Sequence, residues 1–260
     1  MMLEPLQYLL GGGSGVLVGF ILGLIGGGGS VLAVPLMVYL VGVPSPHVAI
    51  GTSAFAVAAS AVLNLANHAR AGNVNWRCAG MYAAAGVIGA YVGSSLGKLF
   101  DGQKLLALFA LLMIAIGILM LRGRGNPGTE GAACTRRKAP KVLGYGLMTG
   151  VFSGFFGIGG GFLIVPGLIA STGMPMLNAI GSSLVAVTAF GLTTAASYAW
   201  SGLISWGLAG LFVAGGIAGG LIGTRSARLL SERRGALNIV FAAVIIAVAL
   251  YMLARNLSLS

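Results

Sequence analysis

Two glycine-rich interruptions are the features of this sequence most able to do chemistry. Gly26–Gly29 and Gly157–Gly161 each break a long apolar stretch and precede residues that can start a new helix. Glycine frees the backbone torsions, and the N–H groups of a helix starting at such a break can bind an anion. The alternative is close helix packing through small residues. The expected anion-binding residues are Gly27, Gly28, Gly29 and Ser30 in the first copy and Gly159, Gly160 and Gly161 in the second.

Hydroxyl side chains follow each interruption, early in the next apolar stretch. Each pair comes directly after a glycine, Gly51 in the first copy and Gly181 in the second. Hydroxyls can donate hydrogen bonds to an anion without carrying charge, although they can also bond to the carbonyl groups of their own helix. The residues of this second expected group are Thr52, Ser53, Ser182 and Ser183.

A third group comprises Asn64 and His68, which lie about one helical turn apart. Polar residues inside a membrane span are costly and are usually functional, so both are expected to contact substrate. They also approach Arg70, and solvation at the membrane surface is the alternative. His47 lies in a turn bounded by prolines and is expected to be exposed.

The elements that must hold these residues are membrane-spanning helices. The chain has 260 residues, 57% hydrophobic and only 7% charged, whereas a soluble domain carries about a quarter charged residues. A bilayer core requires about 20 apolar residues in a helix. The fold class is therefore all-α and polytopic, with apolar stretches near 6–41, 48–69, 76–97, 104–121, 142–172, 178–199, 205–224 and 235–254.

The two halves of the chain repeat. Gly26–Pro35 matches Gly157–Pro166, and Ala49–Ser53 matches Ala179–Ser183. Such internal repeats are typical of transporters. The expected organisation is a first membrane repeat at 1–121, a basic linker at 122–141 and a second membrane repeat at 142–260.

The positions of the basic residues favour one orientation of the repeats. If the stretches 6–41 and 142–172 each cross once, the repeats are parallel and nine of the 15 basic residues share the side of the linker. If each glycine break produces two passes, the repeats are inverted and twelve of the 15 basic residues lie on the side of the linker. Positive charge gathers in the cytoplasm, so we predict inverted repeats, each with a broken first helix, and a cytoplasmic linker. Val31–Val41 is short, which leaves the completeness of the second pass open.

Several classes of function are disfavoured by what the chain contains. The four acidic residues, Glu4, Asp101, Glu130 and Glu232, all lie in termini or loops. No enzyme, cofactor or metal motif is present, so no cofactor is expected. The net charge of +11 arises from residues in short loops, which set topology and contact lipid, so nucleic acid is not an expected partner. The two cysteines lack metal or redox spacing, and a disulfide is not expected.

The duplicated glycine break, followed by a hydrophobic run with proline and then by Gly-Thr-Ser or Gly-Ser-Ser, resembles the sulfite exporter TauE/SafE family. The motifs are Gly26–Pro35 with Gly51–Ser53, and Gly157–Pro166 with Gly181–Ser183. The first copy departs from the second by having Ser30 where the second has Gly161. The resemblance implies a permease of the bacterial inner membrane for small anions, typically sulfur-containing ones such as sulfite or an organosulfonate.

Two other classes remain open at the level of sequence. An anion channel would share the topology without alternating access, and a membrane assembly partner would not transport. The sequence does not decide the exact substrate, the direction of transport, the coupling ion or the oligomeric state, for which a homodimer is one option.

Overall fold

The computed structural model describes residues 5–25, 27–122, 137–157, 161–229 and 234–257, apart from the side chains at 25, 27, 28, 120, 122, 227–229, 234–241 and 257. Within these ranges the chain is helical and contains no strand, which confirms the all-α prediction. The elements are α1 (Pro5–Ile25), η1 (Gly27–Leu32), α2 (Ala33–Pro35), η2 (Leu36–Leu40), α3 (Pro46–Arg70), α4 (Trp76–Gly97), α5 (Gly102–Arg122), α6 (Ala139–Phe156), α7 (Gly161–Thr172), α8 (Met176–Trp200), α9 (Trp206–Leu229) and α10 (Arg234–Leu257).

Each of the two long apolar stretches folds back on itself at its glycine break. In the first half, Gln7 Nε2 at the start of α1 lies 3.5 Å from the carbonyl oxygen of Gly42, which follows η2. In the second half, Lys138 Nζ, just before α6, donates to the carbonyl oxygen of Thr172 at the end of α7, at 2.6 Å. The chain after each break therefore returns to the side where that half began.

The boundary between linker and second repeat differs slightly from the one expected at residue 142. Helix α6 already begins at Ala139, with Pro140 in its first turn. Proline suits this position because its fixed φ matches a helix and the first N–H groups need no partner within it. The region 123–136 of the expected linker lies outside the described residues.

The two halves are interleaved through rows of glycine. Helix α1 packs along α9, and α6 packs along α4. A Cβ at Gly19 would overlap the backbone of Gly216, and one at Gly150 would overlap the backbone of Gly86. Small residues let two helix backbones approach closely in a membrane, so these rows fix α1 against α9 and α6 against α4.

The central helices α3 and α8 run in opposite directions. Gly51, near the start of α3, lies against Leu203 beyond the end of α8, and Gly181, near the start of α8, lies against Asn73 beyond the end of α3. At the periphery, α5 and α10 are also antiparallel, because Asn256 Nδ2 near the end of α10 donates to the carbonyl oxygen of Gln103 at the start of α5, at 3.0 Å.

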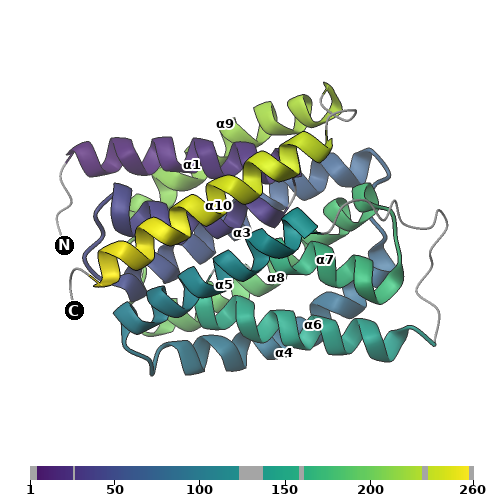
Figure 1. Cartoon of the computed structure of the whole chain (residues 1–260), viewed down its shortest axis with the longest axis horizontal. Coiled ribbons are helices and arrows are strands. Elements are labelled where there is room, and N and C mark those ends of the chain that lie inside the picture. The colour runs from purple at the N-terminus through teal and green to yellow at the C-terminus, as the bar shows by residue number, and fades with distance from the viewer. Residues whose placement is uncertain (1–4, 26, 123–136, 158–160, 230–233, 258–260) are drawn as a thin grey trace.

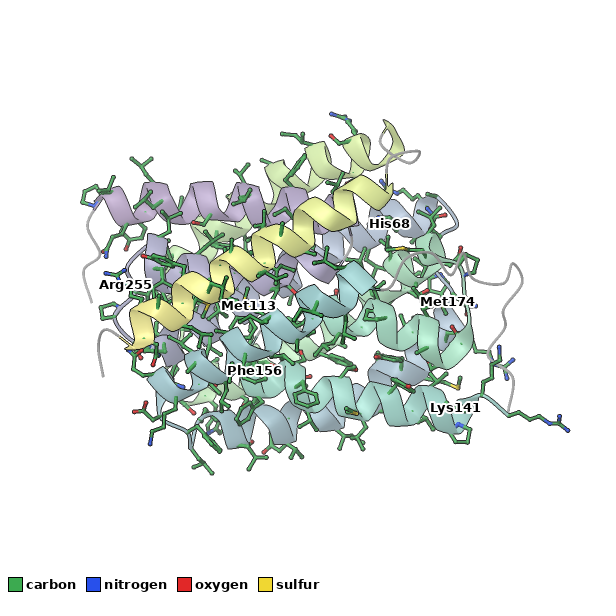
Figure 2. All side chains as sticks on the ribbon, viewed as in Figure 1. His68, Met113, Lys141, Phe156, Met174 and Arg255 are labelled. Atoms are coloured by element: carbon green, nitrogen blue, oxygen red, sulfur yellow. The ribbon has the colours of Figure 1, made fainter. Side chains whose placement is uncertain are left out.

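The bundle therefore has two distinct ends, which lie at opposite sides of Figure 1. We call the end where α5 finishes and α6 starts the linker end, and the end where α1 starts and α10 finishes the distal end. Figure 2 shows His68, Met174 and Lys141 toward the linker end and Arg255 at the distal end. Cys78, at the start of α4, is disulfide-bonded, contrary to the expectation from sequence, and its partner lies outside the described residues.

The surface of the bundle suits a bilayer. Six helices of the described part are long and apolar enough to cross a membrane, and Gly29–Leu40 and Gly161–Thr172 are shorter apolar helical segments. Many large apolar side chains are exposed along the sides of the bundle, while Trp200 and Trp206 are exposed at the distal end and Trp76 at the linker end. Tryptophan is enriched where a membrane meets water, so the two ends correspond to the two membrane surfaces.

Candidate functional site

The first glycine break is more tightly packed than its sequence predicts. Gly27–Leu32 form a 3₁₀ helix rather than unwound chain. Gly29 is buried against the backbone of Leu22 in α1, where an added Cβ would collide with the Leu22 nitrogen, and Ser30 is fully buried. Close packing therefore explains Gly29. The side-chain surroundings of Gly27 and Gly28 lie outside the described residues.

The second break begins with a left-handed residue. Helix α6 ends at Phe156, and Gly157 adopts a φ of 67°, with its N–H bonded to the carbonyl oxygen of Ser153. Only glycine adopts this conformation at low cost, and a Cβ here would also overlap Ile50 of α3. Gly161 is buried at the start of α7. Gly159 and Gly160 lie outside the described residues.

The two breaks lie at different depths. The first is beside Leu22 in α1, whose neighbour Gly23 packs on Gly220 of α9, and Gly220 in turn contacts Asn64 of α3. The second is beside Ile50, at the other end of α3. Ile50 and Asn64 are fourteen residues apart in one helix, which corresponds to about 21 Å at 1.5 Å per residue.

From the sequence, both glycine-broken helices are expected to bind the anion near mid-membrane. In the structure the breaks lie toward opposite ends of α3, although η1 also contacts α7. Gly157 of the second half meets the segment of α3 that leads into Gly51-Thr52-Ser53 of the first half. The 3₁₀ segment η1 of the first half contacts α8 of the second half. Each break therefore contacts the helix of the other half that carries the hydroxyl residues.

The hydroxyls that follow Gly51 and Gly181 divide into two kinds. Thr52 Oγ1 accepts a hydrogen bond from the Ser205 N–H at 3.0 Å, and Ser182 Oγ accepts one from the Asn75 N–H at 2.9 Å. These two hydroxyls hold the turns α8–α9 and α3–α4 against the other half, and each retains its own proton for donation. The other two, Ser53 Oγ and Ser183 Oγ, donate to carbonyl oxygens of their own helices at 3.0 and 2.7 Å.

The Asn64 amide has a structural role in the bundle. Its Nδ2 donates to the Ser60 carbonyl oxygen at 3.0 Å, and its Oδ1 accepts from Thr224 Oγ1 of α9 at 3.3 Å. Asn64 is only 2% exposed. His68 is buried one turn further on, toward the linker end. The amide therefore joins α3 to α9, which sequence reasoning could not foresee because Thr224 is far away along the chain.

A cluster at the distal end was missed by sequence reasoning. Lys98 Nζ, just past the end of α4, lies 5.8 Å from the centroid of the Tyr198 ring, and the ring of His47 lies 6.4 Å from the same ring. Lys98 Nζ also donates to the Ser197 carbonyl oxygen at 3.0 Å and to Ser201 Oγ at 3.2 Å. His47 is only partly exposed, contrary to expectation. One signal was available, because Tyr198 is the counterpart of His68 in the repeat.

Metal binding has no support within the described part of the chain. No group of three or more His, Cys, Asp or Glu side chains there could hold a metal ion. Asp101 is the one acidic residue in the described ranges, and its carboxylate accepts from the N–H groups of Gln103 and Lys104 at the start of α5.

Comparison with known proteins decides the family. The model of the family described as sulfite exporter TauE/SafE matches residues 12–252. This chain belongs to that family. A protein of Xylella fastidiosa named as a probable membrane transporter protein is 54% identical over 94% of both chains. Similarly named proteins of Methanocaldococcus jannaschii and Bacillus subtilis (YunE) are 29% and 25% identical, over 65% and 84% of this chain and 65% and 88% of theirs.

No solved structure matches the chain. The family and the names of the relatives indicate a membrane transporter. Together with the apolar helices, they establish a multi-pass membrane protein.

Proposed function

We propose that this TauE/SafE-family protein is a secondary transporter of small anions, with sulfur oxyanions such as sulfite or an organosulfonate as its substrates. The observation that carries the proposal is the chemistry of the bundle interior. Buried hydroxyls follow Ile50 of α3, which contacts the second break, and lie on α8, which contacts η1 of the first break. Asp101, the one acidic residue of the described ranges, lies between α4 and α5 and outside the helices. A cation carrier would need carboxylates or many carbonyl ligands within its spans, while an anion needs hydrogen-bond donors.

The proposed binding residues form two composite groups rather than one. Gly159, Gly160 and Gly161 would act with Thr52 toward the distal end, and Gly27, Gly28 and Ser30 with Ser182 toward the linker end. In each group one half contributes backbone N–H groups and the other half contributes a hydroxyl. Two sites related by pseudo-symmetry, at different depths, suit a carrier that opens to the two sides in turn.

We further propose that the halves are inverted repeats in a bacterial inner membrane, with the linker end in the cytoplasm. The antiparallel directions of α3 and α8 support the inversion. Lys98, Lys104 and Arg255 lie at the distal end, and nine basic residues of the described ranges lie at the linker end. The sequence assigns the remaining three, Arg124, Arg136 and Arg233, to the connections on the linker side. This imbalance supports the assignment of sides.

Cysteine labelling tests this orientation. Single cysteines would replace Arg137, Arg228 or Lys104 in an otherwise cysteine-free chain and be exposed to an impermeant maleimide in intact cells. Labelling from outside is expected at position 104 only. Labelling at 228 from outside, with 137 protected, would contradict the inverted arrangement.

Uptake into proteoliposomes tests the transport function. The panel comprises sulfite, sulfate, thiosulfate, sulfoacetate, taurine and chloride, with protein-free liposomes as reference. We expect saturable uptake of at least one sulfur oxyanion, accelerated when the same anion is loaded inside. Uptake without saturation or trans-stimulation would indicate a channel, and no uptake above the reference for any anion would refute the proposal.

A further inference from the structure

Two buried hydroxyls on α8 have no hydrogen-bond partner among the described residues. They are Thr194 Oγ1 and Tyr198 Oη, and both side chains are 0% exposed. The two residues are one turn apart, and the tyrosine ring in a helix leans back toward the preceding turn. Leaving a buried hydroxyl unpaired costs about 1–3 kcal/mol, so neighbouring unpaired groups need an explanation.

The other buried tyrosine shows that this fold can pair such a group. Tyr82 Oη accepts a hydrogen bond from Thr149 Oγ1 at 2.9 Å. The hydroxyls of Ser14, Ser60 and Ser153 are also buried without a partner among the described residues, but a serine or threonine in a helix, Thr194 included, can rotate to a carbonyl of the preceding turn. The hydroxyl at the tip of the Tyr198 ring cannot reach its own backbone in this way. Tyr198 is therefore the residue for which a ligand is the more direct explanation.

The surroundings of Tyr198 offer hydrogen-bond donors and positive charge. The Lys98 ammonium lies 5.8 Å from the ring centroid and uses two of its three N–H groups on Ser197 and Ser201. The imidazole of His47 is tilted beside the same ring, with 6.4 Å between the ring centroids, and its buried Nδ1 has no partner among the described residues. Asp101 is held by the first turn of α5. A ligand that suits this set carries negative charge and several acceptor oxygens.

The same cluster adjoins the second glycine break. A Cβ at Gly51 would lie 2.9 Å from the Tyr198 Cβ, and the preceding residue, Ile50, abuts Gly157. Thr52 follows directly. Tyr198 thus lies between the distal surface, where Lys98 is, and the composite group formed by Thr52 and the second break.

We propose that Thr194, Tyr198 and Lys98, with His47 beside them, form an oxyanion-binding subsite at the distal end of the bundle. The subsite rests on the proposed anion transport and gives it a recognition element: the –SO₃⁻ or similar oxyanion group binds these donors at the distal side. The repeat counterparts of Thr194 and Tyr198 are Asn64 and His68, so an amide and an imidazole stand at the corresponding positions toward the linker end.

The test uses substitutions that remove one hydroxyl and little else. Tyr198→Phe and Thr194→Val preserve the volume of the side chain, Lys98→Gln removes the charge, and Tyr82→Phe is the matched control in which a paired tyrosine hydroxyl is lost. Binding of sulfite, methanesulfonate and chloride to the purified full chain in detergent would be measured by calorimetry. Transport KM would be measured with substrate added on either side of oriented proteoliposomes.

We expect the Kd for sulfite or methanesulfonate to rise at least tenfold in Tyr198→Phe, Thr194→Val and Lys98→Gln, with chloride binding weakly throughout. The Tyr82→Phe control should lower the unfolding temperature and leave Kd within twofold. The KM should rise chiefly for substrate added at the distal side.

Failure of the subsite and failure of the transport proposal give different results. If the wild type transports a sulfur oxyanion while Tyr198→Phe and Thr194→Val bind and transport it normally, the subsite is wrong and the function stands. If the wild type binds the oxyanion through these residues without moving it, the subsite stands and the function falls. If phosphate-headgroup lipid competes with methanesulfonate and no free anion is transported, the donors hold lipid and the substrate subsite is refuted.

Discussion

The contact of α3 with α9 and the contact of α8 with α4 are equivalent positions of the repeated fold, but they differ in the side chains that they contain. In each, a central helix of one half packs on a glycine row of the other half. On α3, Ser60 packs against Gly216, and Asn64 packs against Gly220 and bonds to Thr224. On α8, the aromatic ring of Phe190 packs against Gly86, and the next turns carry Thr194 and Tyr198.

The difference shows how a duplicated fold can separate structural from ligand-binding roles. The amide of Asn64 is satisfied within the protein, so that contact holds the bundle together. The hydroxyls of Thr194 and Tyr198 are not satisfied by any described residue, while the large ring of Phe190 supplies the packing instead. The same backbone geometry therefore serves stability on one side and recognition on the other.

The largest expected effect is the loss of stability when the packing glycine of each contact, Gly86 or Gly216, is replaced by alanine. A Cβ at Gly86 would overlap the buried ring of Phe190, which stacks on Tyr82, whereas a Cβ at Gly216 would meet mainly the Ser60 hydroxyl. Overpacking of a rigid site costs about 1–3 kcal/mol. We expect Gly86→Ala to destabilise the protein by about 3 kcal/mol and Gly216→Ala by less than about 1 kcal/mol. Thermal unfolding of both variants in detergent would show this order, and equal losses would contradict it.

The next contrast is between the glycines proposed to bind the anion at the breaks and the glycines that pack helix against helix. We expect Gly28→Ala and Gly160→Ala to fold normally but to transport at least about tenfold more slowly, which is about 1.4 kcal/mol on the transition state. Gly89→Ala and Gly219→Ala are the controls, because a Cβ there would overlap the carbonyl oxygens of Leu147 and Val16. These controls should lose folded protein together with transport.

Transport rates would be normalised to the amount of folded protein recovered. Normal transport rates in the Gly28 and Gly160 variants, or losses of transport only in proportion to the loss of folded protein, would mean that these glycines serve helix packing and not anion binding.

A smaller effect on unfolding free energy should distinguish Asn64 from its repeat counterpart Thr194. Asn64→Leu removes the bonds to Ser60 and Thr224, and hydrogen bonds between membrane helices contribute about 0.6–1.7 kcal/mol. We expect a loss of about 1 kcal/mol in unfolding free energy. Thr194→Val removes an unpaired hydroxyl, so its unfolding free energy should be unchanged or higher. A Thr194→Val variant as unstable as Asn64→Leu would mean that Thr194 is bonded within the protein.

The smallest effect is expected at Ser53 and Ser183. Both hydroxyls donate to a carbonyl of their own helix, a bond that adds little to helix stability. Ser53→Ala and Ser183→Ala should change unfolding free energy by less than about 0.5 kcal/mol and leave transport KM unchanged. An increase in transport KM in either variant would indicate that the serine contacts the substrate.

The sequence predicts the helices well because the signal is local. Apolar length, the glycine breaks and the repeated Gly51 and Gly181 motifs are all read within single segments. It does not predict that Thr52 accepts from the Ser205 N–H or that Asn64 bonds to Thr224. Those partners lie in the other half, and only the interleaved packing brings them together.

The depth of the two breaks escaped prediction for a similar reason. Each break is apolar on both sides, so its sequence does not say how far α1 or α6 extends before the turn. That depth is fixed by Gly29 on Leu22 and Gly157 on Ile50. The cluster around Tyr198 was missed because Lys98, His47 and Tyr198 come from three separate segments, none of which stands out by itself.

The interleaving of the halves also governs how the protein must be made. The glycine face of α1, including Gly15, Gly19 and Gly23, packs on α9, which leaves the ribosome almost last. Contacts between segments so distant along the chain form late. A nascent chain halted after α5 would hold α1 and α4 in the bilayer with their glycine rows uncovered, recognisable to membrane proteases as incomplete. We therefore expect the packing of the first half to be completed only when residues 206–229 enter the membrane.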